Sequence, residues 1–148
     1  MFCNAEYIIL KKGIKMKLLN DEDEEVVRMA REVIVSNYDN VNINHTVGAA
    51  VRGKSGKIYI GINVYSIHGA CAEQVALGNA IAHGEREFVI IVAVRGKDGK
   101  EVIPPCGNCR QILSDYAPNC EVIISKENNT LGKVLAKELL PFAYEVES

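Results

Sequence analysis

Excess positive charge is absent from this sequence. The formal net charge is −2, the isoelectric point is about 5.9, and no run of arginines occurs. A protein that binds an extended phosphate backbone normally carries a strongly basic surface, because lysine and arginine neutralise the bound phosphates. The composition therefore argues against nucleic acid as a partner and fits a small substrate of little charge.

A membrane-targeting segment is also missing from the N-terminal region. Its apolar run, residues 7–10, has no basic residue ahead of it and is far shorter than a signal peptide or a membrane span requires. A second methionine, Met16, stands just before the first expected helix. We therefore interpret residues 1–15 as an N-terminal extension of a domain covering residues 16–148, with an additional edge strand in the extension as the alternative.

Cysteines are few and odd in number. Of the five, three belong to a candidate metal site, which leaves Cys3 and Cys120 as expected free thiols. Free thiols are typical of a reducing compartment, whereas small secreted domains pair their cysteines. The sequence therefore predicts a cytoplasmic protein.

No linker-like stretch and no internal repeat divides the chain. Its 148 residues, 48% of them hydrophobic, suffice for one buried core but not for two. Apolar periodicity and turn residues predict the order α-β-β-α-β-α-β-β. The expected helices are residues 20–37, 72–82 and 107–117, with a short helical piece at 138–140; the expected strands are residues 47–51, 58–64, 88–94, 122–124 and 131–134.

Residues 48–55 formally match the phosphate-binding pattern G-x-x-x-x-G-K-S. A true phosphate-binding loop follows a strand and opens a helix. Here the residues inside the pattern are apolar and strand-like, and residues 57–60 alternate like another strand. We therefore expect a hairpin at this position and reject nucleotide phosphate binding.

Two cysteine motifs carry the chemistry. Cys71-Ala72-Glu73 is followed further along by Pro105-Cys106-Gly107-Asn108-Cys109. Structural zinc sites use four protein ligands, whereas hydrolytic sites keep one position for water. We therefore expect one Zn²⁺ per subunit on Cys71, Cys106 and Cys109, with Glu73 as the catalytic carboxylate, the pattern of the zinc deaminases.

Cys106 and Cys109 taken alone fit other uses of a Cys-x-x-Cys pair. A redox dithiol and half of a zinc knuckle are both compatible with that spacing. Cys71, Glu73 and Pro105 at their positions favour the catalytic zinc site instead. Both motifs are expected to open helices, whose N-terminal N–H groups stabilise thiolates.

Arg110, directly after Cys109, is a candidate for compensating the negative charge of three zinc-bound thiolates. A solvent-exposed or interface arginine is the equal alternative from its neighbourhood alone.

From residue 47 to about residue 144 the chain resembles the small cytidine deaminases. The shared motifs are residues 47–50, 61–64, 71–73, 105–111 and 138–141. The resemblance implies a three-layer α/β/α sandwich around a mixed five-stranded sheet, a zinc held by three cysteines, and a homotetramer acting on a cytosine nucleoside. It also implies substrate contacts by Asn63, by the backbone of Ala72 and by the carbonyl of Pro104.

The chain departs from that family's pattern at the sugar and base contacts. Tyr65 and Ser66 replace a glutamate and an asparagine, His45 stands where a phenylalanine is usual, and Gln74 stands where an arginine is usual. Residues 63–65, 68–70 and 138–144 resemble the blasticidin-S deaminases, a branch whose substrate is a cytosine nucleoside with a modified sugar. His45 and Tyr65 are therefore expected substrate contacts.

The sequence thus predicts hydrolytic deamination of the 4-amino group of a cytosine nucleoside. Unmodified cytidine or deoxycytidine and a modified nucleoside such as blasticidin S both remain open as substrates. A non-catalytic zinc-binding domain is the alternative outside the enzyme class. Glu73 argues against it, because such a domain needs no carboxylate there.

Overall fold

A mixed β-sheet forms the middle layer of the protein. The computed structural model describes residues 7–9 and 15–147. The strands are β1 (Tyr7–Ile9), β2 (Lys15–Lys17), β3 (Val47–Gly53), β4 (Ile58–Ile62), β5 (Phe88–Arg95), β6 (Glu101–Ile103), β7 (Glu121–Ser125) and β8 (Leu131–Leu135). Their order is β1-β2-β8-β7-β5-β3-β4, with β6 paired to β5. The β5–β7 pair is parallel and the others are antiparallel.

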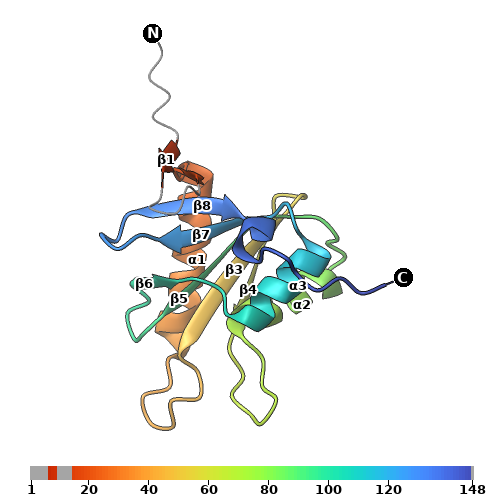
Figure 1. Ribbon diagram of the computed structural model, residues 1–148. Coiled ribbons are helices and arrows are strands. Elements are labelled where there is room, and N and C mark those ends of the chain that lie inside the picture. The colour runs from red at the N-terminus through yellow and green to blue at the C-terminus, as the bar shows by residue number, and fades with distance from the viewer. Residues whose placement is uncertain (1–6, 10–14, 148) are drawn as a thin grey trace.

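Helices cover both faces of this sheet (Figure 1). Helix α1 (Asp21–Asn37) lies on one face, and α2 (Ala72–Ala82) and α3 (Gly107–Tyr116) lie on the other. A short 3₁₀ helix, Ala136–Leu139, follows β8. Each face has its own buried apolar cluster, and β5, buried along most of its length, contributes to both. The predicted α/β/α sandwich is confirmed.

The five-stranded detail of that expectation is wrong, because the described residues form a sheet of eight strands. The three additional strands, β1, β2 and β6, have three residues each. Strand β1 lies within residues 1–15 at the edge of the sheet, where an additional strand was the alternative, whereas β2 and β6 were not predicted. A three-residue strand is too short to display an alternating pattern, and its place is set by backbone pairing with a neighbour.

Strand β2 crosses the proposed start of the domain. It pairs with β8 through Lys17 and Lys133, and the Met16 side chain is fully buried. A Cβ added to Gly132 would lie 2.3 Å from Met16 Cγ, so Met16 packs directly on the β8 backbone. The division into residues 1–15 and 16–148 stays a prediction, and Cys3 lies outside the described residues.

Helix α1 begins with a capping box. The Asn20 side chain accepts the N–H of Asp23 at 3.0 Å, and Asp23 Oδ2 accepts the N–H of Asn20 at 2.9 Å. Apolar residues three and four apart then face the sheet, which explains why this helix forms. Four of them are completely buried: Val26, Val27, Ala30 and Ile34.

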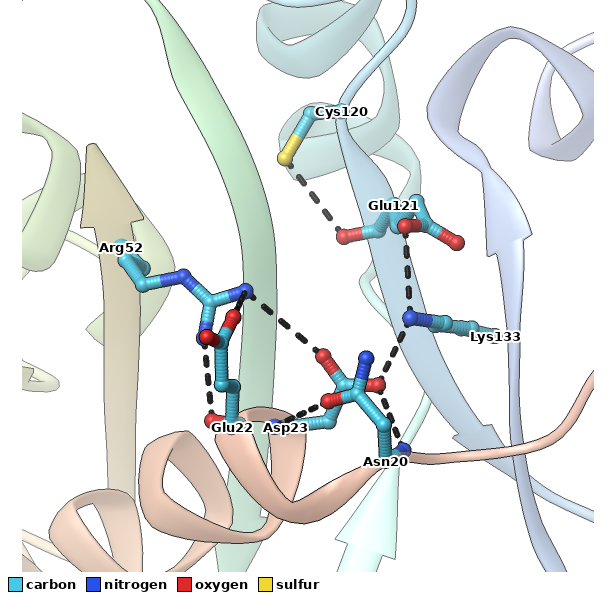
Figure 2. Close-up of polar contacts among 7 residues, drawn as sticks. All are labelled: Asn20, Glu22, Asp23, Arg52, Cys120, Glu121 and Lys133. Carbon is cyan, nitrogen blue, oxygen red and sulfur yellow. Dashed lines mark hydrogen bonds and ion pairs between the residues drawn. The ribbon is translucent and has the colours of Figure 1, made fainter. Parts of the chain in front are cut away.

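Asp23 also anchors α1 to the sheet (Figure 2). Lys133 Nζ of β8 lies 2.6 Å from Asp23 Oδ2 and 3.3 Å from the Glu121 carboxylate of β7. Arg52 of β3 lies 3.7 Å from Asp23 Oδ1. Asp23 is fully buried and Lys133 is 3% exposed. A buried ionic group thus connects the start of α1 to three strands.

Strand β4 allows α2 to approach the sheet very closely. A Cβ added to Gly61 would lie 2.3 Å from the backbone nitrogen of Ala76 and 2.6 Å from the carbonyl oxygen of Ala72. Only glycine leaves room for backbone at that distance. This contact fixes the first turn of α2, where one of the cysteine motifs lies.

The segment that resembles a phosphate-binding loop is a hairpin, as expected. Residues 48–53 lie in β3, which pairs antiparallel with β4 from Ile58 onward. No helix follows the pattern, so its rejection is confirmed. Among the described residues, no helix is long and apolar enough to span a membrane.

Candidate metal and active site

The three predicted metal ligands meet at the starts of two helices. Cys71 immediately precedes α2, Cys106 immediately precedes α3, and Cys109 lies in the first turn of α3. All three Sγ atoms lie within 4.8 Å of one another, and the Sγ atoms of Cys71 and Cys106 are 3.5 Å apart. Within residues 7–9 and 15–147, this is the single group of three or more such side chains placed to share a metal ion.

The donor set fits zinc. Three thiols on neighbouring helix starts suit a tetrahedral, thiolate-preferring cation, and no fourth protein side chain of ligand type joins them in the described part of the chain. Cys106 is exposed and Cys109 is buried, so the group is reached from one side. This is the geometry of a metal site with one open position.

Electrostatics of the cysteine group also favour a bound cation. Burial raises the pKa of Cys71, and burial together with the nearby Glu73 and Cys71 charges raises the pKa of Cys109. Desolvation acts to raise the pKa of Cys106 too, but hydrogen bonds from the Cys109 N–H and from Cys71 outweigh it and lower that pKa. Three adjacent thiolates repel one another, and a divalent cation removes that penalty because coordination deprotonates thiols.

Glu73 lies in the first turn of α2, in the same pocket as the cysteines. Its side chain is 5% exposed, and burial raises its pKa, although its own backbone N–H and Cys109 act in the opposite direction. A carboxyl that is buried yet lines an open pocket can exchange protons with a ligand there. Glu73 does not belong to the group of side chains placed to share a metal ion, so it is not a candidate ligand.

A pocket of about 340 Å³ opens beside the cysteines, a size usual for small-molecule sites. Of the predicted substrate contacts, Asn63, Tyr65, Ala72 and Pro104 line it. His45 does not line it and lies exposed beside Asn63. Other lining residues that the sequence reasoning did not single out are Val47, Ile103 and Asn108. Asn108 had a detectable signal, since it lies between two cysteines that were identified.

Arg110 points at backbone next to the metal site and does not line the pocket. Its Nε donates to the Pro105 carbonyl at 2.8 Å, and its Nη1 donates to the Leu139 carbonyl at 3.0 Å. The guanidinium therefore fixes the residue that precedes Cys106 and ties α3 to the 3₁₀ helix. The hydrogen bond to Pro105 keeps the half-buried positive charge of Arg110 near the cysteines.

Gln74 holds Cys71 from the other side. Its side-chain oxygen accepts the Cys71 N–H at 3.0 Å. This bond orients Cys71. The sequence analysis noted only that Gln74 replaces a usual arginine and did not predict this role. Gln74 lies three residues after the helix cap Cys71, and this spacing could have predicted the hydrogen bond.

The fold and the site together define a class of protein: an α/β/α metal-dependent hydrolase with its three candidate ligands at two helix starts, beside a buried carboxylate. The model of the cytidine and deoxycytidylate deaminase zinc-binding region matches residues 20–125. The chain belongs to this zinc-dependent deaminase family.

Individual relatives agree with that assignment. The chain is 38% identical over 135 residues to blasticidin-S deaminase of Bacillus cereus, covering 85% of this chain and 94% of that protein. It is 35% identical over 106 residues to cytidine deaminase of Halalkalibacterium halodurans, covering 68% and 78%. The crystal structure of cytidine deaminase from Burkholderia pseudomallei is 29% identical, with a TM-score of 0.67 over 85% of this chain and all of that one.

Proposed function

We propose that the protein hydrolyses the 4-amino group of a cytosine nucleoside to give the uracil product and ammonia. The observation that carries this proposal is the buried Glu73 carboxyl, placed in one pocket with a three-cysteine group at two helix starts. A non-catalytic zinc domain would gain nothing from burying a carboxylate beside an open cavity, where its desolvation costs stability.

Cys71, Cys106 and Cys109 would hold the zinc. When bound, zinc supplies a Lewis acid that makes water nucleophilic near neutral pH. Arg110, held on the Pro105 carbonyl, adds positive charge close to these ligands. The N–H groups at the two helix starts add more, because a helix N-terminus carries partial positive charge.

Glu73 would move the protons of the reaction. It takes a proton from the attacking water as oxygen bonds to C4 of the ring, and it delivers that proton to ring N3. A second proton from the same oxygen then passes through Glu73 to the amino group, which leaves as ammonia when the C4–N bond breaks. The Pro104 carbonyl, which a proline keeps although it lacks an N–H, accepts a hydrogen bond from the amino group, and the Ala72 backbone orients the ring.

The pocket favours a nucleoside over a nucleotide. None of the residues that line it is lysine or arginine, and a bound phosphate calls for such partners. Tyr65 and Ser66, where the resemblance leads one to expect an acid and an amide, favour a substrate whose sugar differs from ribose. The similarity to a blasticidin-S deaminase favours the same candidate.

We also propose a cytoplasmic homotetramer. A surface groove between α2 and α3 carries apolar side chains, among them Ile81, Ile112 and Tyr116. Tyr116 is 63% exposed in the single chain, which fits a surface covered by another copy. Light scattering coupled to size exclusion should give a mass four times that of the chain; a monomeric mass would exclude this assembly.

The variant Glu73→Gln tests the catalytic assignment. It should fold and retain zinc, because the carboxyl is not a ligand, while turnover falls by about 10²- to 10⁴-fold, as is typical when a general acid-base group is lost. Glu87→Gln is the matched control, since Glu87 is exposed and pairs with Lys54 away from the pocket. Ultraviolet assays against cytidine, deoxycytidine, blasticidin S and free cytosine then identify the substrate. Turnover of none of them by the zinc-loaded wild type would contradict the proposal.

A further inference from the structure

The pocket beside the cysteines has two ends. The proposed reaction requires C4 of the cytosine ring to lie at the end where Cys71, Cys106 and Glu73 meet. The sugar is attached to N1, which lies across the ring from C4, so the sugar points to the opposite end. The loop of residues 64–70 projects beyond the start of α2 and forms part of the pocket wall (Figure 1). We call the end of the pocket at this loop the sugar end.

The loop of residues 64–70 has a closed backbone. Val64 and Ala70 are joined by two backbone hydrogen bonds of 2.9 Å, in which the N–H of each donates to the carbonyl of the other. Gly69 has a φ of +45°, and a Cβ at this position would lie 2.8 Å from the Val64 carbonyl oxygen. Only glycine tolerates both conditions. His68, directly before Gly69, is therefore presented to the pocket from a well-defined turn.

The side chains at the sugar end can donate hydrogen bonds. Of the described residues that line the pocket, none is lysine or arginine, and Glu73 is the one carboxylate. The 64–70 loop contributes the hydroxyl groups of Tyr65 and Ser66 and the imidazole of His68. An imidazole donates an N–H in either protonation state and can also carry a positive charge. An anionic group could therefore bind at the sugar end without meeting a carboxylate there.

His68 differs from the other two histidines of the chain. Nδ1 of His45 lies 2.9 Å from the Asn63 carbonyl, and Nδ1 of His83 lies 2.8 Å from the Asn79 carbonyl. The exposed ring of His68 makes no hydrogen bond or ion pair with the rest of the described chain. It is also the one histidine that lines the pocket. Both of its ring nitrogens are thus available to a ligand.

We infer that His68 is a specificity-determining residue, which donates a hydrogen bond to a carboxylate on the sugar of the substrate. The inference rests on the proposed deamination of a cytosine nucleoside. An ionised acceptor forms a stronger hydrogen bond than a neutral one, so a carboxylate gains more from the imidazole than a hydroxyl group does. A phosphate calls for lysine or arginine, and neither residue lines the pocket.

Three nucleosides of similar shape test this assignment. They are cytidine, the analogue in which a carboxylate replaces the 5′-CH₂OH group, and the neutral carboxamide of that analogue. The wild-type kcat/KM for the carboxylate should exceed that for the carboxamide by about 10- to 100-fold, the size of one hydrogen bond to a charged group. The difference should lie mainly in KM, because His68 contacts no reacting atom.

Variants of His68 should change this ratio of carboxylate to carboxamide activity. His68→Phe keeps a ring but removes the donor, so the ratio should fall to about one, while activity on cytidine changes by about threefold, the size of a weak neutral hydrogen bond. His68→Arg should restore the preference, because a guanidinium binds a carboxylate with two donors. Ile67→Ser is the matched control, since Ile67 is 97% exposed in the same loop and does not line the pocket. It should leave the ratio unchanged.

Two results of these assays overturn the inference and leave the proposed function standing. One is equal wild-type activity on the carboxylate and the carboxamide, and the other is a preference that His68→Phe retains. Faster turnover of cytidine 5′-monophosphate than of the carboxylate would overturn it as well, because the anionic group would then be a phosphate.

Calorimetry decides the role of His68 without turnover. Zinc-loaded Glu73→Gln should bind the carboxylate about 10- to 100-fold more tightly than the carboxamide, and adding His68→Phe should remove that difference. Equal binding of the two ligands by Glu73→Gln contradicts the inference. Inactivity of the wild type on every cytosine nucleoside refutes the proposed function instead, and the binding comparison still decides what His68 does.

Discussion

Removing Lys133 should destabilise the protein more than any surface charge does. The Lys133 ammonium, 3% exposed, is bonded at 2.6 Å to the fully buried Asp23 (Figure 2). Lys133→Met leaves that carboxylate without its main partner, and Asp23 Oδ1 already accepts no hydrogen bond. Breaking a buried pair costs about 3–5 kcal/mol. We expect about 3 kcal/mol, the lower end, because Arg52 remains 3.7 Å away.

Urea unfolding at one fixed protein concentration measures this loss. With a slope of about 2 kcal/mol per M, the midpoint of Lys133→Met should fall by about 1.5 M. Asp23→Asn combined with Lys133→Met removes both charges and keeps an acceptor for the Asn20 N–H, so it should recover at least half of the loss. The control Arg28→Met removes two exposed ion pairs on α1, with Glu25 and Glu32, and should leave the midpoint nearly unchanged.

The buried-charge argument fails if Lys133→Met resembles Arg28→Met. It also fails if the double variant loses the sum of its two single losses, because the cost would then come from packing and not from an unpaired charge.

Three further outcomes are expected. Metal analysis of protein purified without chelator should find one zinc per chain, and Cys109→Ser should lose most of it; a chelator should lower both the melting temperature and the activity. Gly61→Ala should cost about 1–3 kcal/mol of unfolding free energy, because its Cβ would lie 2.3 Å from the α2 backbone, and an unchanged urea midpoint would show that α2 can shift freely. Backbone hydrogen bonds from Asn42 and Val41 lower the pKa of Asp39 below its ordinary value of 3.8. The Asp39 carboxylate therefore stabilises the folded state above that pH, and this stabilisation is lost as the pH falls through the lowered pKa. The difference in urea midpoint between wild type and Asp39→Asn should shrink from pH 7 to pH 3.

The main elements of the fold could be predicted because each has a local signature. The α1 cap, the apolar run of β5 and the turn between β3 and β4 each depend on residues that are close together in the sequence. The short strands β2 and β6 were missed because three residues are too few to display an alternating pattern. The buried pair was missed for a different reason, since Asp23 and Lys133 are 110 positions apart and each looks like an ordinary surface charge in its own segment.

The metal site could be predicted because its chemistry depends on residue type and short spacing. Cys71 and Cys106 were expected to open helices, and the structure confirms that they do. The surroundings could not be predicted in the same way. Arg110 donates hydrogen bonds to two backbone carbonyls, and the Asn63 side chain accepts two backbone N–H groups. These contacts depend on the path of the loops in space and not on the motif in which each residue occurs.

Among the described strands one pair is parallel, β5 with β7, and this pair limits where the protein can vary. Parallel neighbours cannot be joined by a tight turn, so the chain between them must include a long crossover. That crossover contains α3 and two of the three cysteines. The loops at 39–46 and 64–70 carry no such obligation. Protein engineers who wish to change substrate preference can therefore redesign the 64–70 loop, which lines the pocket, while the crossover that carries Cys106 and Cys109 must stay long enough to join two parallel strands.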